Sequence, residues 1–297
     1  IELSDRAGIL AETSFRAEGN AGQINLQGET LQATEGSKIS SATFGQGNGG
    51  RVDIQVDAID LETESKISSA TRGQGNGGSV DIQTDTLGLE TGSEISSETF
   101  REGNGGSLTD QANDIALTGA DTLRTGIVAS TQPGSEGDAG SIDLDVETLQ
   151  VTAGAQISSA TSGQGDGNTL TIRANNVEVS GIAPSNEPLS SSIVASAEPG
   201  SEGSAGSIDM TVKELRVADQ GRISVSDLGV GDASSLNIVA NLNIVADRIF
   251  LTDGGTLAAE VAAGDRGNIV LMADSFLLMR RGALISANAT NDATGSN

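Results

Sequence analysis

Short runs of alternating apolar and polar residues recur along the chain and are separated by corners rich in glycine. In the clearest stretch, residues 67–69 (ISS), 80–83 (VDIQ) and 87–89 (LGL) each alternate at a period of two, as half-buried strands do. Between the first two runs lies a turn at residues 73–78 (GQGNGG), whose glycines and asparagine tolerate positive φ. No segment keeps a period of 3.6 residues, and glycine recurs too often for a helix. The pattern predicts a unit of three short strands and three corners.

This unit is repeated almost unchanged. Ser37–Glu64 and Ser65–Gly92 are 28 residues each and are identical at 21 positions. Self-similarity at a fixed period of this size is typical of solenoid architectures. Three short strands cannot bury their own apolar edge, so each unit must stack on copies of itself. The sequence therefore predicts an all-β fold, a β-solenoid.

One apolar residue of the first predicted strand marks every coil. Its spacing varies from 28 to 36 residues, which predicts about ten three-stranded coils. With coils separated by the strand spacing of about 4.8 Å, ten of them form a rod of roughly 45–50 Å. The residues expected to stack in this column are Ile9, Ile39, Ile67, Ile95, Ile127, Ile157, Ile193, Ile223, Leu257 and Ile285.

The spacing varies because some corners carry insertions. Ile127–Leu149 closely matches Ile193–Leu215, and both segments carry a longer corner with the sequence Pro-Gly-Ser-Glu-Gly. Long corners usually project from one face of a solenoid, where binding residues tend to lie. We expect two neighbouring ridges with candidate recognition residues at matching places, or else neutral insertions. These residues are Pro133 and Glu136 in the first corner and Pro199 and Glu202 in the second, each preceded by a further insertion at Gly119–Thr125 and Gly181–Ser191.

The two ends of the sequence read as interior parts of coils. Ile1 to Ser4 resembles the middle of a strand, and no polar cap of the kind that protects terminal repeats is visible at either end. We expect residues 1–297 to form a single β-helix domain, an uncapped fragment of a longer protein whose further coils are its immediate partners.

Composition narrows the function. The 297 residues include 40 glycines and five phenylalanines, but no cysteine, histidine, tryptophan or tyrosine, which suits a narrow core better than a thick globular one. The net charge of −25 repels phosphate and argues against nucleic acid as a partner. No apolar run reaches 18 residues, so no membrane span is predicted. The acidity either keeps a long surface soluble or provides sites for a hard cation.

An acidic column is the candidate cation site. Asp53 and Asp81 fall at equivalent places in the second predicted strand, where like charges on neighbouring strands are unfavourable and calcium would relieve them. However, the calcium-binding nonapeptide pattern is absent, because Gly49-Gly50 is followed by Arg51-Val52-Asp53. We therefore expect no cofactor and keep calcium as the alternative. The candidate residues are Asp53, Asp81, Asp143, Asp145 and Asp209.

An asparagine column marks the glycine-rich corner. Its stacked side chains either hydrogen-bond along the solenoid axis, as in other cross-β ladders, or are present because asparagine suits a left-handed turn. Both explanations are structural. The column consists of Asn20, Asn48, Asn76 and Asn104 and continues as Asp138 and Asp166.

Two other functions fit the sequence poorly. Polysaccharide-cleaving enzymes can use β-helices, but here no histidine provides a base and no tryptophan or tyrosine stacks on sugar, so we expect no enzyme. Ice binding requires a regular, exposed threonine face. The threonine column shares its side with an inward isoleucine, which predicts that it faces the interior. It consists of Thr43, Thr71, Thr99, Thr131 and Thr161.

The recurring phrase G-S-x-I-S-S-x-T, followed by G-N-G-G-x-V-D-I and L-x-L, is clearest at Ser37–Leu61, Ser65–Leu89 and Ser93–Leu117. It resembles the repeat region of filamentous-haemagglutinin-like exoproteins, particularly the very large secreted repeat proteins of cyanobacteria. The resemblance implies a right-handed parallel β-helix, exported by two-partner secretion to the cell surface or the medium, where it acts in adhesion or surface structure.

From the residues and the resemblance together we expect a rigid β-helical stalk or fibre that displays an interaction surface. Glycans or proteins of a host, a neighbouring cell or the matrix are the expected partners. The alternative is a carbohydrate-active or carbohydrate-binding β-helix, which a clustered acidic groove would favour over a uniform acidic wall.

Overall fold

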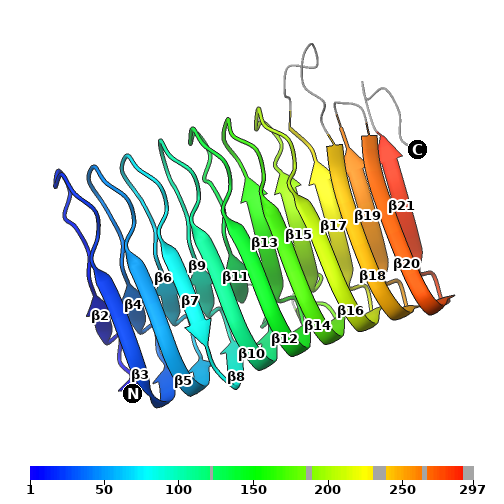
Figure 1. The fold of residues 1–297 in the computed structure, drawn as a ribbon, viewed down its shortest axis with the longest axis horizontal. Coiled ribbons are helices and arrows are strands. Elements are labelled where there is room, and N and C mark those ends of the chain that lie inside the picture. The colour runs from blue at the N-terminus through cyan, green and yellow to red at the C-terminus, as the bar shows by residue number, and fades with distance from the viewer. Residues whose placement is uncertain (121–122, 185–188, 230–238, 263–265, 290–297) are drawn as a thin grey trace.

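The computed structural model describes residues 1–120, 123–184, 189–229, 239–262 and 266–289. These residues form β-strands and turns that wind into a stack of coils, with the N-terminus at one end and the last strands at the other (Figure 1). The fold is the predicted right-handed parallel β-helix, of about nine turns. Within the described residues, no helix is present that is long and apolar enough to cross a membrane.

Two parallel sheets run the length of the stack, and each coil contributes to both of them. Sheet A contains β1 (Glu2–Leu3), β3 (Gln23–Ala33), β5 (Arg51–Leu61), β7 (Ser79–Gln83), β8 (Thr86–Glu90), β10 (Ser107–Thr118), β12 (Ser141–Thr152), β14 (Thr169–Ser180), β16 (Ser207–Ala218), β18 (Val239–Leu251) and β20 (Arg266–Met279). Sheet B contains β2 (Gly8–Leu10), β4 (Lys38–Ser40), β6 (Lys66–Ser68), β9 (Glu94–Ser96), β11 (Gly126–Val128), β13 (Gln156–Thr161), β15 (Ser192–Ala197), β17 (Arg222–Asp227), β19 (Thr256–Val261) and β21 (Leu284–Ala289).

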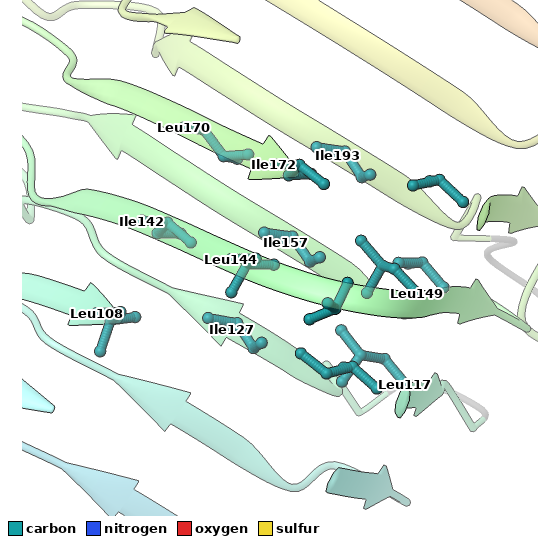
Figure 2. Packing of buried hydrophobic residues seen from close by; sticks show 14 of the residues in the cluster. Leu108, Leu117, Ile127, Ile142, Leu144, Leu149, Ile157, Leu170, Ile172 and Ile193 are labelled. Atoms are coloured by element: carbon teal, nitrogen blue, oxygen red, sulfur yellow. The ribbon is translucent and has the colours of Figure 1, made fainter. Parts of the chain in front are cut away.

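The predicted first-strand column is confirmed in register. Ile39 pairs with Ile67, and Ile67 pairs with Ile95, in adjacent strands of sheet B. The same column begins with Ile9 and continues through every predicted residue to Ile285. The core is a narrow layer of these residues and the inward residues of sheet A, and Figure 2 shows Ile127, Ile157 and Ile193 beside Leu144 and Ile172.

The prediction of three separate strands in each coil is wrong for most coils. The second and third predicted strands form one long strand of sheet A, such as β5, in which the inward residues shift from Val56 to Ile59 at a bend. Backbone pairing with the neighbouring coil resumes directly after the bend, so the strand does not end there. Only β7 and β8 are separate among the described strands of sheet A, and at the gap between them the Thr84 hydroxyl lies within hydrogen-bond distance of the carbonyls of Asp57 and Thr86.

Candidate functional surfaces

The asparagine column forms a hydrogen-bonded ladder along the glycine-rich corner. The backbone N–H of Asn76 donates to Oδ1 of Asn48 at 2.9 Å, and the N–H of Asn104 donates to Oδ1 of Asn76 at 2.9 Å. The same bond joins Asn48 to Asn20 and extends through Asp138 and Asp166 to the N–H of Ser204. Each side chain therefore ties its coil to the backbone of the next coil.

The alternative explanation for the asparagines, a left-handed backbone, is wrong. Positive φ is found at the preceding residues Gly47, Gly75 and Gly103, with values of 135°, 134° and 124°, and at none of the asparagines of the column. Glycine is tolerated in this region because it has no Cβ. The glycine makes the turn, which leaves the asparagine free to hydrogen-bond with its side chain.

The threonine column faces the interior, as predicted. All five threonines are at most 1% exposed. The Thr71 hydroxyl donates to the carbonyl of Asn76 at 2.6 Å and accepts the N–H of Gly49 at 2.8 Å, so it joins the turn of its own coil to the turn of the preceding coil. A buried column of this kind presents no threonine face to ice.

The acidic column is outward-facing and partly neutralised by the protein itself. The Arg51 guanidinium lies between Asp53, at 2.6 Å, and Asp81, at 3.3 Å. This arginine supplies positive charge at the place where calcium was the alternative source of it. Arg173 similarly contacts Asp143 at 2.7 Å.

The other two calcium candidates also have protein neighbours. Asp209 accepts a hydrogen bond from the Asn243 amide at 2.7 Å, and Asp145 lies opposite Arg173 in the register of the sheet. Within the described ranges, no three His, Cys, Asp or Glu side chains converge as a metal site would require. The structure therefore pairs Asp53 with Asp81 on neighbouring strands and spreads the other three candidates along the wall of sheet A.

A polar groove that the sequence pattern did not predict lies beside this column. Four glutamine side chains form a second ladder, in which each Nε2 donates to the next Oε1 at 3.0, 3.1 and 3.2 Å. Together with Arg51 they line an open groove of 680 Å³, which we call the glutamine trough. Its ladder residues are Gln27, Gln55, Gln83 and Gln111. The signal in the sequence was a glutamine at the fourth place of the same four-residue segment in four successive coils, at 24–27 (INLQ), 52–55 (VDIQ), 80–83 (VDIQ) and 108–111 (LTDQ).

A second missed feature is a cation–aromatic stack at the corner after sheet B. The Arg72 guanidinium carbon lies 4.5 Å from the ring centre of Phe100 and 5.7 Å from that of Phe44, so it is placed between rings of the two neighbouring coils. Such contacts contribute about 0.5–1 kcal/mol at exposed sites. The signal in the sequence was the residue that follows each threonine of the column, which is Phe44, Arg72 and Phe100 in three successive coils.

The proline-containing corners are exposed turns on the coils that carry them. Pro133 and Gly134 form an exposed bulge closed by a hydrogen bond from the Ser135 N–H to the Gln132 carbonyl at 3.0 Å. Glu136 is exposed but pairs with Glu102 of the neighbouring coil, so it lies on the regular wall and not at the tip.

The second proline corner repeats this geometry. Pro199 and Gly200 are exposed, Ser201 donates to the Glu198 carbonyl at 3.0 Å, and the Glu202 N–H bonds to Gly163 at 2.9 Å. The strands leading into the two corners, β11 and β15, are separated only by β13, so the corners are neighbours two coils apart. The companion insertions lie partly outside the described residues, at 121–122 and 185–188.

Among the described residues, burial is the main cause of a raised pKa at three carboxyl groups. Burial raises the pKa of Asp110 to about 7 and that of Asp227 to about 6. Burial also raises the pKa of Glu98, which accepts a hydrogen bond from Gln132 at 2.6 Å. The three groups lie on β10, at the end of β17 and on the outer side of the coil after β9, so they do not form one constellation.

Comparison of the chain with protein-family models, curated proteins and solved structures finds no match.

Proposed function

We propose that this chain is a rigid, non-enzymatic stalk or fibre segment of a secreted or cell-surface exoprotein of the filamentous-haemagglutinin-like kind. The observation that carries the proposal is the continuous parallel register of both sheets from the first strands to the last. This regularity suits a rod of constant cross-section. Here nearly every coil repeats the same inward and outward positions.

Cross-coil bonds along several parallel lines support a mechanical role. The asparagine ladder and the buried threonines connect successive coils at one corner, and the isoleucine column connects them through the core. Because each coil contacts mainly its neighbours, stability adds up along the axis and length can increase without a thicker core. Such a rod keeps its shape while it separates two attachment points.

The paired proline corners are the irregular features that a binding partner would distinguish from the rest of the wall. They stand two coils apart, which is roughly 10 Å along the axis. Export and adhesion follow from the resemblance of the repeat phrase to secreted exoproteins. Glycans or proteins of a host, a neighbouring cell or the matrix are the partners that this role requires.

The test is adhesion of the fluorescently labelled chain to arrayed glycans and matrix proteins. We expect saturable binding that is lost when Pro133-Gly134 and Pro199-Gly200 are removed together, while the melting temperature stays the same. Release of new reducing ends from a polysaccharide panel would overturn the non-enzymatic proposal. Equal binding by the shortened variant would remove the corners from the adhesive surface.

The glutamine trough favours carbohydrate binding as a second candidate function. The two central ladder amides, Gln55 and Gln83, each use one N–H donor and one oxygen lone pair on their neighbours and have a second of each available for hydroxyl groups. We expect the double variant Gln55→Ala with Gln83→Ala to lose glycan binding if the trough is the site. The shortened-corner variant would then bind normally, so the two candidate surfaces are separable in one assay.

A further inference from the structure

A carboxyl group occupies a core position of sheet A. Asp110 on β10 lies in the inward column, paired in register with Ile82 of β7 on one side and Leu144 of β12 on the other. It is 4% exposed. The same column contains Ile54 and Ile172, which are almost completely buried, so in every one of these neighbouring coils a large apolar side chain stands where Asp110 does.

Asp110 has nothing to neutralise it. Neither carboxyl oxygen has a hydrogen-bond partner among the described residues. The charged residues of the elements packed around it alternate to the outer faces of the sheets, and burial alone raises its pKa from 3.8 to about 7. These residues are Asp81 on β7, Glu90 on β8, Asp114 on its own strand, Asp143, Asp145 and Glu147 on β12, and Glu94 and Glu98 on the β9 side of the coil.

The strand break lies against the same strand. β7 ends at Gln83 and β8 begins at Thr86, whereas β10 continues without interruption alongside both. At the gap, the N–H groups of Asn113 and Asp114 both point to the carbonyl of Asp85, in place of one bond per residue. The contact between these two coils therefore combines an irregular backbone ladder with an unpartnered buried acid.

We propose that Asp110 acts as a pH-sensitive latch: when it is protonated, the β7–β8 coil stays packed against the β10 coil, and when it is ionised, this junction opens locally. An ionised carboxylate without a partner is strongly unfavourable in an apolar core. Opening admits water to the carboxylate, whereas the coils on either side remain stacked on their own neighbours. A rod made in an acidic compartment would thus be uniformly closed, and at neutral or alkaline pH it would have one defined weak point.

The direction of the pH dependence follows from linkage. Because the closed state raises the affinity of Asp110 for its proton, closure is most favourable below the open-state pKa of about 4 and weakens as pH rises. The opening constant should increase about tenfold per pH unit between about pH 4 and pH 7 and level off above that range.

Hydrogen exchange of the full chain, measured by mass spectrometry from pH 5 to pH 8 and corrected for intrinsic exchange rates, tests this latch. We expect amides of β7, β8 and β10 to lose protection about a hundredfold between pH 5 and pH 7, while those of β14 and β16 change little. Asp110→Asn replaces the ionisable carboxyl group with a neutral amide and should abolish this pH dependence. Asp110→Leu restores the apolar column. In this variant the amides of β7, β8 and β10 should stay protected from exchange at every pH.

A neighbouring exposed acid provides the matched control. Asp143→Asn removes a carboxylate from the outer face of β12 and should leave the pH dependence of β7, β8 and β10 unchanged. The latch is overturned if Asp110→Asn and Asp110→Leu retain the wild-type pH response. It is equally overturned if all strands lose protection together, because the acid would then act on the whole rod and not on one junction.

Discussion

The close stacking of glycines at the corner before sheet A makes Gly78→Ala a sensitive probe of the coil geometry. A Cβ atom at Gly78 would overlap the carbonyl oxygen of Gly50 in the preceding coil and the hydroxyl of Ser69 across the corner. A Cβ atom at Gly50 would likewise overlap the carbonyl oxygen of Gly22, and one at Gly106 would overlap the carbonyl oxygen of Gly78. The glycine column therefore leaves no room for a side chain in any of these coils.

The cost of Gly78→Ala can be worked out from the bonds that hold these atoms in place. The Gly50 carbonyl accepts hydrogen bonds from the Ser69 hydroxyl at 2.6 Å and from the Ser79 N–H at 3.0 Å. Moving it away weakens both, at about 1 kcal/mol each. Forcing the backbones apart adds about 1–3 kcal/mol, as overpacking does elsewhere. We expect a loss of about 3–5 kcal/mol.

Gly28→Ala is the matched control, since a Cβ there meets no atom within 4 Å and the residue pairs with Val56 of the core. We expect it to leave stability unchanged or raise it by up to about 1 kcal/mol, because alanine restricts the unfolded chain more than glycine does. Thermal unfolding and urea titration, each followed by circular dichroism, measure both variants. Equal midpoints for Gly78→Ala and Gly28→Ala would refute the close approach of the coils at Gly78.

Asn76→Ala should lower stability by about 1 kcal/mol, because the next coil loses the acceptor of its N–H bond, whereas Asn76→Asp keeps an acceptor and should melt close to the wild type. Ile82→Asp should cost several kcal/mol by burying a charge in the core. A wild-type melting curve for Ile82→Asp would contradict the inward register. Calcium or chelator should shift the melting temperature no more than ionic strength does. A saturable calcium-specific rise, lost on changing Asp53 and Asp81 to Asn, would show that arginine alone does not neutralise this column.

The coil register was readable from the sequence because every coil must bury the same apolar side chain at the same place. A column such as Ile39, Ile67 and Ile95 allows only one alignment of the repeats. The asparagine column was readable for the same reason, since residues at one position of a repeat must stack. What the side chain does there was decided by the structure, which assigns the positive φ to Gly75 and the hydrogen bond to Asn76.

The features that depend on which coils become neighbours needed the tertiary structure. The sequence pattern separated the second and third strands, but pairing with adjacent coils continues through the bend and joins them. In the sequence, Arg51 is only a residue that does not fit the calcium-binding pattern. The stacking of the coils places its guanidinium between Asp53 and Asp81. Asp110 broke the apolar pattern of its segment, and only pairing with β7 and β12 forces it into the core. A period in the sequence determines which positions align, whereas burial and partners are set by the strands on either side.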